Sequence, residues 1–480
     1  MSSSRFVGRE KQLASLERLL KKKTASLVVI KGRRRVGKSR LIEEFGGKHP
    51  FFTFCGLAPT EKMTAQSQRD EFSLLLSQQF GFPQVYADDW SKLFILLAEK
   101  IKTGRKIILF DEITWMADKD PAFLSKLKNA WDLHLKKNSK LILILCGSIS
   151  GWIEKNILSS SGFFGRISEK ITLNQLSLNN CNKMLTNIGF KRSDLEKFMI
   201  LSITGGIPWY LEQIDPDISA QENIKKLCFE PDGLLVDEFK YIFSDLFGRR
   251  SNIYKKIIKY LVKTPAEFEE IALGIKYEAS GALSEYLNEL IMSGFLKRDL
   301  TWFLKGGKES KLSKYRLSDN YLRFFLRYMS PKLDRIKKGQ FMDIDLSSFA
   351  GLQSVLGLQF ENLVLNNRKS ILKLLNIRPD DVIDENPFFQ RKTDRQGGCQ
   401  IDYLIQTKYN TLYVCEIKFS KNEIKSDIIN QMKKKISRIA IPRGFACIPV
   451  LIHVTDVNDG VNNVDYFGKI INFSQLLEAE

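Results

Sequence analysis

Short, almost fully apolar segments recur in the first third of the chain. They stand at residues 27–30, 51–55, 107–110 and 141–146, and stretches with apolar residues at helical spacing separate them. Apolar strands that alternate with helices are typical of a parallel sheet, because helices cover both of its faces. The pattern predicts an α/β core with a parallel sheet over residues 1–178.

The pattern changes after this core. Residues 179–248 are mainly helical, with a break at residues 205–208. Residues 249–330 predict three helices (252–262, 265–273, 280–292) and a hairpin that pairs 295–298 with 314–317. Residues 331–480 contain a helix from about 360 and strands at 384–392, 400–406 and 412–419. The sequence thus predicts a helical subdomain, a middle module and a second α/β domain.

The composition of the 480 residues adds a basic surplus to this picture. Lys and Arg number 74 against 55 Asp and Glu, which gives a formal net charge of +19. Nearly half of the surplus lies at residues 291–340, where thirteen basic side chains meet four acidic ones, and a second basic run is Lys433-Lys434-Lys435. A surplus of this kind favours polyanionic partners, although it says nothing about the fold.

Membrane and disulfide classes are not favoured. No apolar run approaches the ~18 residues that a membrane span needs, and the start of the chain lacks the apolar stretch of a signal peptide. The seven cysteines are scattered and only three histidines are present. These features predict a cytoplasmic protein with reduced thiols and no membrane partner.

A glycine-rich loop follows the first apolar strand and opens a helix over 39–45. Its residues fit the pattern G-x-x-x-x-G-K-[ST]; they are Gly32, Arg33, Arg34, Arg35, Val36, Gly37, Lys38 and Ser39. The loop N–H groups and the helix N-terminus can surround phosphate oxygens. We expect ATP to bind here with Mg²⁺, Lys38 to reach the β- and γ-phosphates, and Ser39 to hold the metal.

Two further strand ends carry candidate chemistry. The strand at 107–110 ends in Asp111 and Glu112; we expect Asp111 to contact Mg²⁺ and Glu112 to activate the attacking water. Ser148 follows the strand at 141–146 as a candidate γ-phosphate sensor or simply a turn residue. Arg166 is a candidate for stabilising transition-state charge, from its own or a neighbouring subunit, and a surface ion pair is the equal alternative.

These motifs, with the opening Phe6-Val7-Gly8-Arg9-Glu10 and the segment Thr204-Gly-Gly-Ile-Pro-Trp-Tyr-Leu211, resemble the archaeal-type ATPases, a branch of the AAA+/STAND-like P-loop NTPases. The resemblance runs over essentially the whole chain. It implies that residues 6–9 line the adenine side and that 205–208 meet the nucleotide from the helical subdomain. It also implies a C-terminal domain of the PD-(D/E)XK nuclease fold.

The middle module has the order of a winged helix, which is three helices followed by a basic hairpin. In that arrangement the wing residues Lys305, Lys308 and Lys311 would lie along phosphates. The third helix, however, carries Glu285 and Glu289 and no basic residue. Contact with DNA and contact with a protein therefore both remain open for this module.

The C-terminal strands predict a second polar site. Glu416 and Lys418 share one face of their strand, because side chains alternate, and a tight hairpin brings Asp402 beside them. We expect Asp402 and Glu416 to hold Mg²⁺, Lys418 to position water and Glu361 to be the fourth member of a phosphodiesterase site. The arrangement resembles the PD-(D/E)XK nucleases. It departs from their motif in one position, because Ile401 and not proline precedes Asp402. A domain kept only for binding, or ordinary ion pairs, are the alternatives.

The sequence therefore predicts an α/β protein of four parts. They are a P-loop ATPase core (1–178), a helical lid subdomain (179–248), a winged helix (249–330) and a PD-(D/E)XK nuclease-like domain (331–480). The favoured function is ATP hydrolysis coupled to DNA binding and Mg²⁺-dependent DNA cleavage. The alternatives are a nucleotide-dependent switch with a silent nuclease-like domain and a defence effector whose nuclease is released by nucleotide state. Assembly into a homo-oligomer is left open.

Overall fold

A computed structural model describes residues 6–247, 251–394 and 397–479. The chain separates into two compact units. The first comprises Phe6–Asn174 and the end of helix α12 (Glu238–Phe247), and the second comprises Gln175–Tyr241 and the described chain from Ser251 onward.

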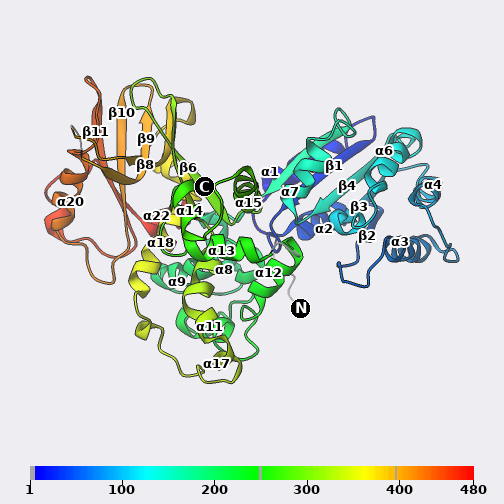
Figure 1. Ribbon diagram of the computed structural model, residues 1–480, viewed down its shortest axis with the longest axis horizontal. Coiled ribbons are helices and arrows are strands. Elements are labelled where there is room, and N and C mark those ends of the chain that lie inside the picture. Colours follow the sequence, from blue (N-terminus) through cyan, green and yellow to red (C-terminus); the bar gives the residue numbers. More distant parts are fainter. Residues whose placement is uncertain (1–5, 248–250, 395–396, 480) are drawn as a thin grey trace. The chain divides into compact units, whose positions relative to one another are not determined.

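A five-stranded parallel sheet forms the centre of the first unit (Figure 1). Its strands are β1 (Ser26–Gly32), β2 (Phe51–Cys55), β3 (Lys106–Asp111), β4 (Leu141–Gly147) and β5 (Ile167–Leu173), in the order β2-β3-β4-β1-β5. The four predicted strands are confirmed. The prediction missed β5, because this edge strand mixes polar and apolar residues and buries only Ile171 and Leu173.

The helices of this unit cover the sheet and close its core. They are α1 (Glu10–Leu19), α2 (Lys38–Gly46), α3 (Ala65–Phe80), α4 (Trp90–Lys100), α5 (Ile113–Met116), α6 (Phe123–Leu133) and α7 (Ser150–Ile153). Buried aromatic rings join α3 and α4 to β2 and β3; Phe72, for example, stacks on Phe54 at 4.5 Å and meets Phe110 edge-on at 5.4 Å. Large aromatic side chains dominate core stability, so these rings anchor β3 in the core.

The second unit begins with a helical segment. Its helices are α8 (Leu178–Asn187), α9 (Asp194–Thr204), α10 (Pro208–Leu211) and α11 (Ala220–Cys228). The predicted break is present between α9 and α10. Gly206 is required there, because a Cβ at this position would lie 2.3 Å from the Leu176 carbonyl oxygen.

The predicted middle helices and hairpin are also present. They are α13 (Ser251–Leu261), α14 (Phe268–Gly274), α15 (Gly281–Met292), β6 (Leu296–Trp302) and β7 (Glu309–Leu317). The two strands are antiparallel with Leu296 opposite Leu317, and an isolated bridge joins Ala266 to Tyr315. This is the order and pairing that the hydrophobic pattern predicts.

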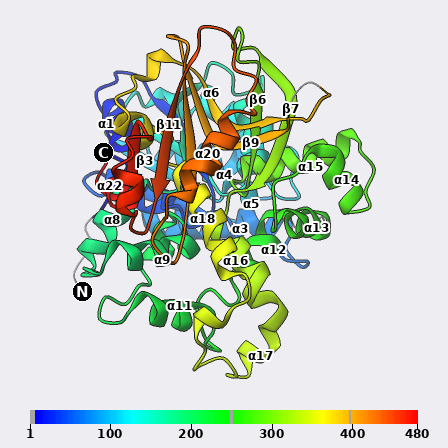
Figure 2. The same cartoon turned by 90° about the vertical axis from the view of Figure 1, so that its left-hand side faces the viewer.

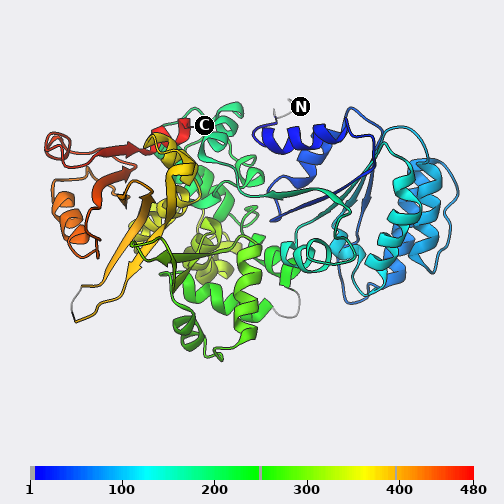
Figure 3. The same cartoon turned by 90° about the horizontal axis from the view of Figure 1, so that it is seen from above.

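The remainder of the second unit contains a mixed sheet in the order β12-β11-β10-β9-β8 (Figure 3). Its strands are β8 (Val382–Gln390), β9 (Cys399–Thr407), β10 (Thr411–Lys418), β11 (Ala446–His453) and β12 (Lys469–Asn472). Its helices are α16 (Asn320–Phe324), α17 (Leu333–Lys337), α18 (Leu352–Leu365), α19 (Arg368–Leu374), α20 (Asp427–Ile436), α21 (Asp459–Asn462) and α22 (Phe473–Glu478). Strands β8 to β10 are antiparallel, whereas β10 to β12 are parallel. This is a separate α/β arrangement, as predicted.

The β6–β7 hairpin lies beside the mixed sheet (Figure 2), and its side chains enter the core next to that sheet. Trp302 and Leu304 belong to the same buried cluster as Leu404 and Val414, and α20 contributes Met432. The Trp302 indole N–H also donates to the Gln406 side-chain oxygen at 2.5 Å. The hairpin and the mixed sheet therefore share one core.

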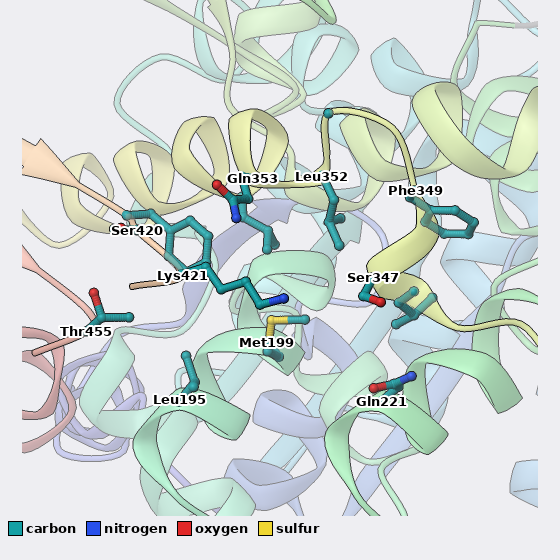
Figure 4. A pocket seen from close by; sticks show the side chains of 14 residues that line it. Leu195, Met199, Gln221, Ser347, Phe349, Leu352, Gln353, Ser420, Lys421 and Thr455 are labelled. Carbon is teal, nitrogen blue, oxygen red and sulfur yellow. The ribbon is translucent and has the colours of Figure 1, made fainter. Parts of the chain in front are cut away.

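A pocket of about 480 Å³ lies in the second unit. Figure 4 shows Leu195 and Met199 of α9 facing Leu352 of α18, with Lys421 extending between them. Phe419, which directly follows the last residue of β10, also lines it. The pocket thus borders both the strand and the helix that carry the predicted C-terminal site.

The structure bears on the membrane and disulfide classes. Within the described ranges, no helix combines the length and apolarity that crossing a membrane requires. All seven cysteines are free thiols, and four of them are buried. The prediction of unpaired cysteines is therefore confirmed.

Candidate nucleotide site and carboxylate cluster

The ends of three neighbouring strands meet at the phosphate loop. Strand β4 pairs with β1 on one side and with β3 on the other. The sheet order therefore sets Ser148, just after β4, between the loop after β1 and Asp111–Glu112 at the end of β3. Ligands of open parallel sheets bind at the carboxyl ends of strands where the connections diverge.

Glycine is required at both ends of the phosphate loop. A Cβ on Gly32 would lie 2.5 Å from the Leu173 carbonyl oxygen. Gly37 has a φ of 88°, in the left-handed region that favours glycine, and directly precedes α2. The two glycines let the loop curl into the start of α2, where the backbone N–H groups of a helix N-terminus favour an anion.

The Lys38 ammonium is buried against its own loop. It donates to the carbonyl oxygens of Gly32 at 3.0 Å and Arg33 at 3.2 Å. Arg33 and Val36 are buried, and Arg34 and Arg35 are half-buried. A phosphate at the loop would offer Lys38 a stronger, charged acceptor than these carbonyls.

The two predicted Mg²⁺ ligands lie together. The Ser39 hydroxyl donates to Asp111 Oδ2 at 3.2 Å, across 72 residues of sequence. A hydroxyl and a carboxylate are the hard oxygen ligands that Mg²⁺ accepts, with water and phosphate completing its octahedron. The donor set therefore fits a magnesium ion held beside a nucleotide.

Glu112 is held by Ser148. The Ser148 hydroxyl lies 2.7 and 2.8 Å from the two Glu112 carboxylate oxygens, and its backbone N–H donates to Oε2 at 3.2 Å. Glu112 has a φ of 47°, unusual for a residue with a side chain. Burial and the charges of Asp111 and Glu112 raise the pKa of the nearby Cys55 thiol to about 11. The strand ends thus form a negative site that a cation would neutralise.

Arg166 forms an ion pair within the first unit. Its guanidinium donates to both carboxylate oxygens of Asp132 in α6, at 2.8 to 3.1 Å. Arg166 is the first cause of the lowered Asp132 pKa, and Lys136 and Lys128 add to it. The ion-pair alternative is therefore the observed state, and a role at phosphate stays a prediction.

Arg9 is a loop contact that the sequence pattern did not reveal. Its guanidinium donates to the carbonyl oxygens of Val36 at 3.2 Å and Asn174 at 2.5 Å. Only the resemblance indicated residues 6–9 as part of a nucleotide site. Spacing alone gives no signal for a contact to backbone oxygens so far along the chain.

The C-terminal carboxylates gather on β9, β10 and α18. The β9–β10 register runs to Cys415 opposite Tyr403, so Asp402 and Glu416 are the next residues on the two strands. Asp402 Oδ2 accepts the Ile417 N–H at 3.0 Å. Glu361 on α18 is close enough that burial first, and then the Asp402 charge, raise its pKa to about 7. The four predicted residues thus share one region. Burial raises the pKa of Asp402 and Glu416, and the charges of Lys435 and Lys418 oppose that rise.

A lysine from α20 lies between two of these carboxylates. The Lys435 ammonium contacts Glu416 Oε2 and is 3.7 Å from Asp402 Oδ1. The described residues contain no group of three His, Cys, Asp or Glu placed to hold a metal. Two carboxylates that converge on one cation still fit Mg²⁺, which proteins often bind through one or two carboxylates and water. Sequence analysis indicated Lys435 only as part of a basic run.

The basic surplus at 291–340 needs a correction. Arg316 is buried and paired with Asp299 at 2.8 Å, with a further bond to Asn362. Arg323 is 1% exposed and donates to the carbonyl oxygens of Val262 and Leu317, each at 2.6 Å. These two arginines serve the fold and cannot belong to a phosphate-binding surface. The exposed wing lysines remain candidates; they are Lys305, Lys308 and Lys311.

The parallel sheet and its phosphate loop define a P-loop NTPase unit. Residues 6–214 match a protein family described as an ATPase domain predominantly from Archaea. Over these residues the chain is similar to archaeal-type ATPase domains.

Individual relatives are more distant. The uncharacterized protein MJECL04 of Methanocaldococcus jannaschii is 27% identical over 370 residues, which span 75% of this chain and 76% of that protein. The Walker-type ATPase PABY2304 of Pyrococcus abyssi is 18% identical, over 67% of this chain and 96% of that one, with a TM-score of 0.48. The Aeropyrum pernix ORC2 protein is 12% identical, over 71% of this chain and 97% of that one, with a TM-score of 0.41.

Proposed function

We propose that this chain hydrolyses ATP at the phosphate loop and couples nucleotide state to DNA binding and Mg²⁺-dependent DNA cleavage. The ATPase half is supported by the meeting of three polar pairs at adjacent strand ends. They are Lys38 with its loop carbonyls, Ser39 with Asp111, and Glu112 with Ser148. These are the cation, the metal ligands and the base that phosphoryl transfer to water needs.

In this proposal each residue has a defined task. Lys38 exchanges its loop carbonyls for β- and γ-phosphate oxygens, and Ser39 and Asp111 would hold Mg²⁺. The metal, when bound, neutralises phosphate charge. Glu112 accepts a proton from the attacking water, and Ser148 fixes the direction in which that carboxylate points.

The cleavage half rests on Asp402, Glu416, Lys418 and Glu361. Asp402 and Glu416 would hold Mg²⁺, and Lys418 orients water and offsets charge on the scissile phosphate. Glu361, with a pKa of about 7 because of burial and Asp402, is partly protonated at neutral pH. Its proton lets a third carboxyl group stay in the cluster without a third negative charge.

DNA contact is assigned to the exposed lysines of the β6–β7 hairpin tip. They are Lys305, Lys308 and Lys311. Their exposed ammonium groups suit backbone phosphates, which carry affinity without sequence information. The four-part division at 178, 248 and 330 and assembly into a homo-oligomer remain parts of this proposal.

One observation favours a second function. Lys435 already neutralises Asp402 and Glu416, and no three-ligand metal group lies in the described ranges. A nucleotide-dependent switch that binds DNA or protein, with a silent nuclease-like domain, would keep such an ion pair for stability alone.

A cleavage assay on the full chain separates the two. Single- and double-stranded DNA are incubated with Mg²⁺ or Mn²⁺, with and without ATP. We expect Lys38→Ala to abolish ATP hydrolysis and Asp402→Asn to stop cleavage while ATP hydrolysis persists. Unchanged ATP turnover in Lys38→Ala would remove the phosphate-loop assignment. If the unmutated chain cuts DNA under none of these conditions, the cleavage proposal fails and the nucleotide-dependent switch is the remaining function.

A further inference from the structure

The Lys435 side chain of α20 occupies the place between the two carboxylates where a metal ion would bind. The Lys435 ammonium contacts Glu416 and lies 3.7 Å from Asp402, and the side chains are 30%, 8% and 12% exposed, respectively. We propose that Lys435 is a built-in cation that competes with the divalent metal for these carboxylates, so that metal entry requires Lys435 to leave. This inference rests on the proposed cleavage function.

Charge balance explains why one cation must be present. Asp402 and Glu416 are neighbours on paired strands and largely withdrawn from water. Two carboxylates in such a place repel one another and lose hydration unless a cation compensates them. Lys435 supplies that compensation in the metal-free chain and holds α20 against the sheet.

Charge balance also explains why both cations cannot stay. A divalent ion held by the same two oxygens would lie within a few ångströms of the ammonium, and like charges repel strongly where water is scarce. The two therefore exclude each other. Lys418 does not share this conflict, since no ion pair joins it to either carboxylate within the described chain.

Lys435 has a route out of the cluster. It lies in the last turn of α20, and its flexible stem of four carbons is already partly exposed. Lys433 and Lys434 on the same turn are exposed. A released Lys435 would join them as a phosphate contact, so DNA should assist metal binding by giving the displaced ammonium a new partner.

The test is Mn²⁺ binding to the full chain without nucleotide, measured by titration calorimetry and by the loss of free-Mn²⁺ paramagnetic resonance signal. Lys435→Met removes the charge and keeps the length of the side chain, and Lys434→Met is the matched exposed control. We expect Lys435→Met to bind one Mn²⁺ at least tenfold more tightly than the unmutated chain or the control. Asp402→Asn, added to Lys435→Met, should remove that gain. Equal or weaker Mn²⁺ binding by Lys435→Met would overturn the inference.

A second measurement needs no substitution. Acetylation of lysines in the unmutated chain, quantified by mass spectrometry, should show Lys435 reacting several-fold faster once Mg²⁺ is added, while Lys434 reacts at the same rate. An unchanged Lys435 rate at saturating Mg²⁺ contradicts the competition. If no chain binds Mn²⁺ at the carboxylates, the cleavage proposal fails and this inference with it. If the unmutated chain and both lysine variants bind Mn²⁺ equally and DNA is still cut, only the proposed competition between Lys435 and the metal fails.

Discussion

Replacing Ser148 by Ala tests whether a hydrogen bond orients Glu112, the proposed base for ATP hydrolysis. The substitution removes the hydroxyl that lies 2.7 and 2.8 Å from the Glu112 oxygens. It leaves the Ser148 N–H, which donates to Glu112 Oε2 at 3.2 Å. The carboxylate thus loses its shorter donor and keeps its longer one.

The magnitude follows from the charge on the acceptor. A hydrogen bond to an ionised group contributes roughly 1.5–3 kcal/mol, and each 1.4 kcal/mol lost from transition-state stabilisation is about tenfold in rate. We expect kcat for ATP hydrolysis to fall about ten- to a hundredfold. KM should change little, because Ser148 contacts Glu112 and not the phosphate loop.

The assay is steady-state phosphate release, with nucleotide binding measured separately by a fluorescent ATP analogue. Ser150→Ala is the control, since the buried Ser150 hydroxyl has no hydrogen-bond partner in the part of the chain that the structure covers. In a Glu112→Gln background, Ser148→Ala should add almost nothing, because the two residues act as a unit. An unchanged kcat would refute the orienting role, and a raised kcat would mean that Ser148 holds Glu112 away from water.

Three further outcomes concern the second unit. Burial and Asp402 raise the pKa of both Glu361 and Glu416 from 4.5 to about 7, so near neutral pH the folded chain keeps protons that the unfolded chain has released. The melting temperature should therefore fall as pH rises from about 5 to about 8, and Glu361→Gln should make this pH dependence shallower. The same pH dependence in Glu361→Gln and in the unmutated chain would contradict the prediction. Arg316→Met should cost roughly 3 kcal/mol in urea unfolding, because Asp299 is 2% exposed and keeps only the longer 3.8 Å ion pair with Arg368 among the described residues. Adding Asp299→Asn should recover much of the loss. The three wing lysines are Lys305, Lys308 and Lys311. Replacing all three by alanine should reduce the slope of log DNA affinity against log salt concentration by about two to three. A flat slope in the unmutated chain would point to a protein partner.

The elements that the sequence predicted well are the ones set by local pattern. An apolar run, a glycine loop and a helix start are contiguous, so β1, the phosphate loop and α2 could be read directly. The β6–β7 hairpin followed in the same way. Strand β5 could not be found, because an edge strand buries few of its residues and shows no apolar run.

The hydrogen-bond and ion-pair partners that could not be predicted from the sequence are distant along the chain. Lys435 is 19 residues from Glu416, and Arg316 is 46 residues from Asn362. Both residues were interpreted as surface charge. A lysine or arginine looks the same in a sequence whether its side chain pairs with a buried residue or faces water. The candidate carboxylates, by contrast, lie on one hairpin and could be grouped by strand alternation alone.

The Trp302 contact restricts how this protein can change by recombination. Trp302 is 2% exposed in the core of the mixed sheet and donates to Gln406, which lies 104 residues later. Removing a buried Trp typically costs about 3–5 kcal/mol, a large share of a domain's stability. A crossover near residue 330 that joined a foreign C-terminal domain would therefore leave that core without its hairpin side chains. A domain exchange should give a stable protein only when the segment that includes β6 and β7 comes from the same parent as the mixed sheet. The hairpin and the sheet should therefore be inherited together.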